Sequence, residues 1–230
     1  MRQKTLLFFS VFLSASLFGQ THFVGFKGGI NFANFFERTP EEDGIDDGIQ
    51  NNRNGFNGGL SYLYHFNERI NFGVDLLYSQ RGGTYSGSGN SSVVQSVLEQ
   101  HKLDYLSVPI KGGIVYGDLF SFFTNVGLIP SYLLEHNVLL EITYIDGALI
   151  SFPISEYSED ENVNLEDRNR FDIAGLIEAG VNYKLNSNLL LHTTLGYQYT
   201  FTDYNFNISG GYRNRGIVLH FGIKYALNAE

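Results

Sequence analysis

The sequence contains no cysteine and no tryptophan, and only one methionine and four prolines among 230 residues. Without cysteine the chain can neither form disulfide bonds nor carry the thioether-linked lipid of a lipoprotein, and a closed β-barrel needs neither. No run of 18 or more apolar residues occurs beyond the N-terminus, which argues against a helical membrane span. The mean hydropathy of −0.10 does not exclude a membrane protein, because barrel strands are apolar only at alternate positions.

Basic residues are also few, with 15 Lys and Arg against 24 Asp and Glu. Residues 1–19 are predicted to be a secretory signal peptide, with Arg2 and Lys4 before an apolar core at 6–18. A cut near Gly19–Gln20, or at 14–16, would leave residues 20–230 as one domain. Loss of the two basic residues takes the formal charge from −9 to −11, which argues against nucleic acid as a partner.

What is abundant is phenylalanine, tyrosine and glycine, with 20, 15 and 26 residues. Eight segments show the period-2 alternation of a strand with one apolar face. They are residues 21–34, 55–66, 70–81, 103–114, 119–134, 171–184, 189–202 and 216–227. Their connections are alternately long and short, as in an up-and-down membrane barrel with short periplasmic turns and long extracellular loops. The predicted fold is all-β, an eight-stranded antiparallel transmembrane β-barrel, with the first strand beside the last.

In these segments, charged residues occupy one set of alternate positions (one parity), and large apolar residues occupy the other. The charged positions predicted to face the barrel interior are Lys27, Asp75, Arg81, Lys111, Asp172, Glu178 and Lys224. Asp104 is the only charge expected on the opposite, outward set. The alternation does not show which set faces inward, so a soluble lipocalin-like carrier with the apolar set inside stays an alternative. The aromatic size of the apolar set, the glycines on the polar set and the tyrosines near strand ends favour the membrane barrel.

Three local features lead to narrower expectations. Pro109 cannot donate a ladder hydrogen bond and is expected to mark a bulge. Residues 91–100 are compatible with a short helical turn, and residues 138–145 could extend a hairpin beyond the main sheet. Two acid-rich segments, 37–47 and 141–167, are expected to be solvated loops.

In a narrow barrel, opposite interior charges must pair, because an unpaired buried charge costs several kcal/mol. We therefore expect a structural ion-pair network, with Lys27 and Glu178 as the central pair. A narrow pore or proton path is the alternative. His101 and His136 lie near the predicted extracellular side without a recognisable nucleophile–base spacing. The run Asp43–Gly48 lacks the spacing of a calcium loop. No catalytic residue, metal or cofactor is therefore predicted.

Three motifs resemble the PorT-like outer-membrane β-barrel family of Bacteroidetes. They are VGFKGGINFANF after the predicted signal, LDYLSVPIKGG at residues 103–113 and FDIAGLIEAGVNYKL at residues 171–185. The resemblance implies location in the outer membrane, with lipid as the surroundings and protein partners of a secretion system as a possibility. It supplies no catalytic residues. The expected role is structural or accessory and non-catalytic, with acidic loops outside the cell.

Overall fold

The computed structural model describes residues 21–36, 49–88, 94–145, 147–155, 170–202, 204–205 and 211–227. The predicted signal peptide, residues 1–19, lies outside them, as do residues 37–47 and 156–167 of the acid-rich segments. All regular structure in the described ranges is β-strand. No helix in this part of the chain is long and apolar enough to cross a membrane.

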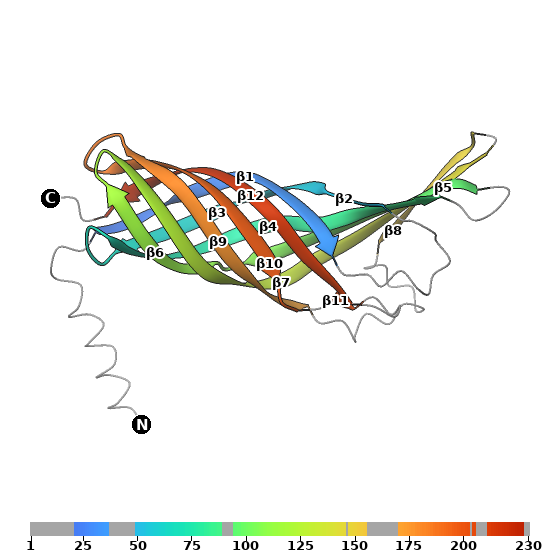
Figure 1. Ribbon diagram of the computed structural model, residues 1–230, viewed down its shortest axis with the longest axis horizontal. Coiled ribbons are helices and arrows are strands. Elements are labelled where there is room, and N and C mark those ends of the chain that lie inside the picture. Colours follow the sequence, from blue (N-terminus) through green and yellow to red (C-terminus); the bar gives the residue numbers. More distant parts are fainter. Residues whose placement is uncertain are drawn as a thin grey trace, which may run out of the picture.

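The strands close into a ring of eight antiparallel wall positions (Figure 1). In ring order they are β1 (Thr21–Phe36), β3 (Arg53–His65), β4 (Ile70–Ser88), β5 (Val94–Ser107) continued by β6 (Ile110–Gly117), β7 (Phe120–Tyr144), β9 (Phe171–Lys184), β10 (Leu189–Thr200) and β12 (Gly211–Ala226). β12 pairs with β1 from Phe23↔Ala226 to Phe36↔Arg213, which closes the sheet as predicted. Three short strands lie off the ring: β2 (Ile49–Asn51), β8 (Leu149–Ser155) and β11 (Tyr204–Asn205).

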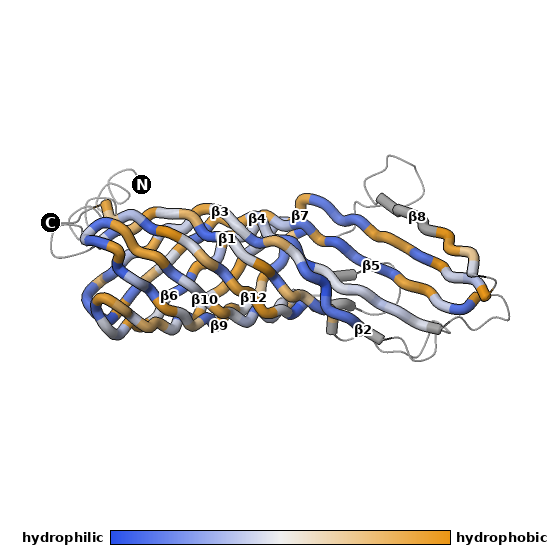
Figure 2. Tube along the Cα trace, turned by 90° about the horizontal axis from the view of Figure 1, so that it is seen from above, coloured by the Kyte–Doolittle hydropathy of each residue, from blue (hydrophilic) through white to orange (hydrophobic). Residues whose placement is uncertain are grey.

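Burial alternates along each wall strand and settles which face points inward. Phe26 and Ile114 are each 66% exposed, whereas Asp75 is 1% exposed. Figure 2 shows hydrophobic and hydrophilic residues alternating along the same strands. The apolar set therefore forms the outside of the barrel and the polar set its interior. The lipocalin-like alternative is wrong, because it requires the reverse arrangement.

The two ends of the barrel differ. Short turns join β3 to β4, β6 to β7 and β9 to β10 at the end where β1 begins and β12 ends (Figure 1). Gly117, with a φ of 110°, makes the sharp bend of the second turn. At the other end β4, β5 and β7 continue far beyond the ring, and β2 and β8 pair with β4 and β7.

The parts of β4, β5 and β7 beyond the ring, together with β2 and β8, form a projecting sheet. Its structure differs from the sequence interpretation in one segment and agrees with it in another. Residues 94–100 are part of strand β5 and not a helical turn, whereas β7 does extend through Tyr144 as a hairpin arm with β8. The sheet stands clear of the barrel in both Figure 1 and Figure 2. It lies at the end that carries the long connections, which is the end expected to be extracellular in a membrane barrel.

Pro109 does not mark a bulge. Ser107 pairs with Leu77 and Ile110 with Val74, so the register is the same on both sides of the gap between β5 and β6. Proline only interrupts the ladder, since its nitrogen has no hydrogen to donate. The irregularity lies in β7, where Asp104 pairs with Glu135 but Tyr105 pairs with Leu133, leaving Leu134 as the extra residue.

The expectation of a single outward charge is also wrong. β12 begins at Gly211 instead of residue 216, and the added length places Arg213 and Arg215 on the outward parity. Asp104 has outward parity too, but it is only 3% exposed. The Tyr78 hydroxyl donates a 2.6 Å hydrogen bond to Asp104, and Lys102 Nζ lies 3.5 Å from the same carboxylate oxygen. A tyrosine and a lysine thus cover this carboxylate on the outer wall.

Candidate functional site in the barrel interior

All seven side chains predicted to face the interior are buried there. Their exposed fractions are Lys27 5%, Asp75 1%, Arg81 2%, Lys111 5%, Asp172 7%, Glu178 3% and Lys224 5%. They come from β1, β4, β6, β9 and β12, which surround the lumen. Strand alternation is what brings them together, because each occupies an inward position of its strand.

Four of these charges form a chain across the middle of the lumen. Lys27 Nζ lies 2.6 Å from Asp75 Oδ2, and Lys111 Nζ lies 2.9 Å from the same oxygen. Lys111 Nζ also lies 2.8 Å from Glu178 Oε1, which accepts a 2.8 Å hydrogen bond from Asn125 Nδ2. The predicted direct pair of Lys27 with Glu178 is therefore wrong. Lys27 reaches Glu178 only through Asp75 and Lys111.

A second charged group lies toward the projecting sheet and is centred on Arg81. Its guanidinium donates from Nη1 to Asp172 Oδ2 at 2.9 Å and from Nη2 to the hydroxyls of Ser131 at 3.0 Å and Ser107 at 3.3 Å. The guanidinium carbon also lies 4.9 Å from the centre of the Tyr105 ring. Arg81 thereby ties β4 to β5, β7 and β9, with several contacts to offset its removal from water.

Lys224, the seventh predicted residue, is not joined to this chain. It is buried on β12, yet among the described residues no carboxylate lies in salt-bridge contact with it. The middle of the lumen therefore holds the lysines Lys27, Lys111 and Lys224 against the carboxylates Asp75 and Glu178. The described charges of this layer do not balance.

Very little space remains between the two charged groups. The cavity there measures about 10 Å³, and its lining includes Lys27, Arg81, Glu178 and Gln198. That volume is about the minimum for one water molecule. A larger groove of about 740 Å³ is lined mostly by outward apolar side chains, among them Val24, Leu60 and Ile223. Its lining also includes residues at inward positions, among them Asp75 and Lys224.

Sequence reasoning missed a contact between His101 and His136 at the mouth below the projecting sheet. His101 Nδ1 lies 3.1 Å from His136 Nε2, and His101 Nε2 lies 2.7 Å from Glu99 Oε1. The Phe35 ring packs edge-on against His101, and Phe35 clusters with Leu103, Tyr105 and Leu133. These side chains lie together at the mouth. The described ranges contain no group of three or more histidine and acidic side chains arranged to hold a metal ion.

The comparison of the chain with known proteins identifies a family. A family model described as "Outer membrane protein beta-barrel domain" matches residues 18–205. No curated protein matches the sequence.

Several solved outer-membrane proteins share structural similarity with the chain. Neisserial surface protein A is 14% identical with a TM-score of 0.46, covering 90% of this chain and 98% of its own. OprG from Pseudomonas aeruginosa is 13% identical with a TM-score of 0.44, covering 91% and 97%. The attachment invasion locus protein Ail of Yersinia pestis is 14% identical with a TM-score of 0.40, covering 89% and 98%.

Proposed function

The chain belongs to the outer membrane protein beta-barrel domain family, and from this premise we propose that it is a closed, non-conducting barrel with an accessory, non-catalytic role. As an outer-membrane β-barrel protein it is surrounded by lipid. The proposal adds that the barrel serves as an anchor that holds the projecting sheet and the neighbouring acid-rich segments outside the cell. The working part of the protein is then its extracellular surface.

The observation that carries this proposal is the chain of contacts Lys27–Asp75–Lys111–Glu178 across the lumen. It leaves a cavity of about 10 Å³ beside it, and Arg81 and the histidine-lined mouth lie above it. Hydrated ions cannot pass a layer with room for a single water molecule. Interior side chains fill eight-stranded barrels in general, which agrees with this arrangement.

Conductance of the purified protein in planar bilayers or liposomes tests the proposal. We expect no channel activity above that of protein-free membranes at neutral pH. The control is to show insertion independently, by protease protection of the barrel in the same vesicles. Steady unitary conductance from inserted protein would contradict the proposal and favour a narrow pore instead.

A secretion-associated role of the PorT kind stays a prediction, because it rests on the three sequence motifs alone. The proposed accessory role is compatible with it, since an anchored extracellular sheet can present a surface to other proteins. Co-purification from native membranes with components of a secretion apparatus would support that narrower role. Absence of any such component under mild solubilisation would count against it.

A further inference from the structure

Lys224 lies in the short-turn half of the lumen, beside an apolar cluster of Phe23, Leu63, Leu190 and Ala226. It pairs in register with Leu190, and Ala226 is the next inward residue of β12. Lys224 is 5% exposed, and no carboxylate of the described residues is in salt-bridge contact with it. A buried ammonium group is strongly unfavourable without a negative partner, so its surroundings have to supply one.

The two carboxylates of the middle layer are already engaged by the other lysines. Asp75 Oδ2 contacts both Lys27 and Lys111, and Glu178 Oε1 contacts Lys111. The charge of Asp75 acts on Lys224, but the two groups are not in contact. Among the described residues, this layer therefore carries one positive charge in excess.

Two glycines bring polar side chains close to Lys224. On β1, Gly25 pairs with Lys224 on one side and with Ser61 on the other, so no side chain stands between these two on the lumen face. On β12, Gly222 is the inward residue before Lys224, and a Cβ atom there would lie 2.1 Å from Cε1 of His192. The His192 ring therefore lies over Gly222, and the charge of Lys224 acts on it.

Ser61 and His192 each have a polar atom without a partner. Ser61 is 3% exposed and His192 4% exposed. Within the described part of the chain, neither Ser61 Oγ nor His192 Nδ1 has a hydrogen-bond partner. A hydroxyl group can donate, an imidazole nitrogen donates when it carries the hydrogen, and an ammonium group only donates. Buried donors need an acceptor, and one anion would serve all three.

We propose that Lys224, Ser61 and His192 bind one small monovalent anion, of the size of chloride, inside the lumen. Lys224 supplies the charge, and Ser61 and His192 supply hydrogen bonds. A single negative charge balances the excess of the layer. The anion has to be small, because side chains fill the interior of an eight-stranded barrel. This inference goes beyond the proposed function, since the anion stabilises the barrel and is not transported.

The test is the stability of the reconstituted protein in two sodium salts, chloride and gluconate, mixed at constant ionic strength and pH. Gluconate is too large for a filled lumen. Urea unfolding is followed by heat-modifiable gel migration after long incubation, because the anion exchanges only when the barrel opens. For the wild type we expect the urea midpoint to rise by about 0.5–1 M for each tenfold increase in chloride above its dissociation constant.

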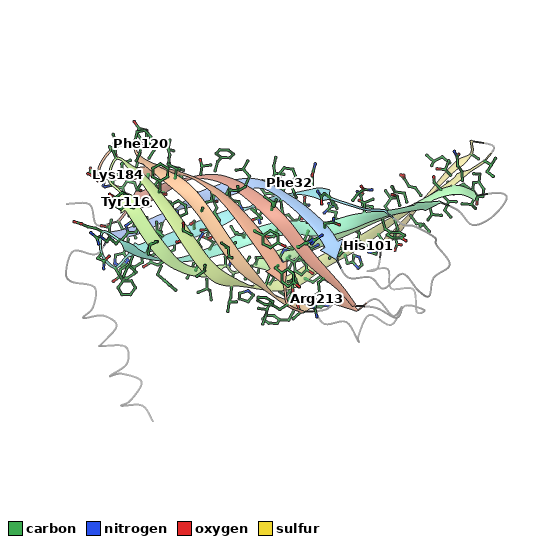
Figure 3. The ribbon with its side chains drawn as sticks, in the orientation of Figure 1. Phe32, His101, Tyr116, Phe120, Lys184 and Arg213 are labelled. Atoms are coloured by element: carbon green, nitrogen blue, oxygen red, sulfur yellow. The ribbon has the colours of Figure 1, made fainter. Side chains whose placement is uncertain are left out.

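The variant Lys224→Met removes the charge and keeps the length of the side chain, and it should lose the response to chloride. Its matched control is Lys184→Met, which removes a lysine whose side chain is 48% exposed at the short-turn end (Figure 3) and should respond as the wild type does. If Lys224→Met does not fold, Ser61→Ala provides the test, and it should need about tenfold more chloride for the same midpoint. Ser121→Ala is the matched serine control, because Ser121 accepts a hydrogen bond from Asn182.

A bromide ion gives the direct identification. Crystals of protein refolded in bromide should show an anomalous scattering peak beside Lys224 Nζ. A wild-type midpoint that is the same in chloride and gluconate would overturn the proposal, as would a response to chloride that survives in Lys224→Met. A midpoint that changes with pH but not with chloride would also overturn it, and would assign an uncharged amine to Lys224. Conductance tests the proposed function separately, because none of these outcomes depends on it.

Discussion

At the scale of single residues, the interior of this barrel depends on a few shared contacts. Asp75 lies in salt-bridge contact with two lysines, whereas Glu178 contacts one lysine and one amide. Burial makes these contacts interdependent, because removing one carboxylate leaves an ammonium group in a site with almost no water. The stability of the barrel should therefore depend unequally on residues of the same chemical type.

Replacement of Asp75 by Asn should lower the free energy of unfolding by about 3–5 kcal/mol, because both Lys27 and Lys111 lose their shared partner. Glu178→Gln should cost less, since Lys111 retains Asp75. Urea unfolding of the reconstituted protein, followed by heat-modifiable gel migration, measures both effects.

The exposed pair of Asp118 and Lys184 at the β6–β7 turn is the natural control. The Lys184 ammonium lowers the pKa of the Asp118 carboxyl through a hydrogen bond and its charge, but water surrounds both groups. Asp118→Asn should cause no resolvable change in stability, because exposed ion pairs contribute little. An Asp75→Asn variant as stable as Asp118→Asn would contradict the structural importance of the interior chain.

At the scale of strands, two neighbouring glycines of β1 show how closely the ring is closed. A Cβ atom at the inward Gly29 would lie 1.7 Å from the Leu219 carbonyl oxygen on β12. A Cβ atom at the outward Gly28 would have its nearest neighbours, the Phe56 ring and the Asn57 carbonyl oxygen, at 3.8–3.9 Å, which is ordinary van der Waals contact. Gly29→Ala should therefore weaken the β1–β12 seam by about 1–3 kcal/mol, and Gly28→Ala should be tolerated. Urea midpoints of the two variants give the comparison, and equal midpoints would contradict it.

At the same scale, the sequence could not predict the bulge in β7. Simple alternation from Ser131 and Leu133 would turn residue 135 inward and leave His136 outside. The bulge at Leu134 reverses this, so His136 turns inward to meet His101. Nothing in the local sequence marks Leu134, because a bulge is decided by the register against β5. Pro109, which does carry a visible signal, leaves the register unchanged.

The sequence could not predict which charged residues pair across the lumen either. Parity alone identified the seven inward charges, since a period of two assigns each residue to a face. It could not assign Lys27 to Asp75 instead of Glu178, because the partner depends on the relative stagger of strands that are not neighbours. The ends of strands were missed for a related reason. Residues 211–215 read as a polar loop, yet pairing of residues 213–215 with β1 and of residues 211–212 with β11 makes them strand.

At the scale of the whole molecule, the order of strands and the closure of the ring were predictable, because alternating connection lengths and the outward apolar residues both follow from insertion in a bilayer. The projecting sheet was predicted only in part, as an extension of one hairpin. Its strands have apolar residues on both parities, such as Val138 and Leu139, so periodicity could not identify them.

On the proposed account, the molecule consists of a lipid-facing wall, a filled interior and a sheet outside the cell. The absence of cysteine makes this arrangement directly testable, since each introduced thiol is the only one. Single replacements Gln95→Cys in the projecting part of β5, Ser187→Cys in the β9–β10 turn and Val126→Cys on the outer wall sample the three environments. Val126 is 60% exposed on the isolated barrel, so only lipid can shield it.

Labelling of these three variants with a membrane-impermeant maleimide tests the account most directly. In intact cells, position 95 should react, position 187 should react only after the outer membrane is permeabilised, and position 126 should stay unreactive in both conditions. Reaction at position 126 in native membranes would contradict a lipid-facing wall. Reaction at position 187 but not at position 95 in intact cells would contradict the orientation.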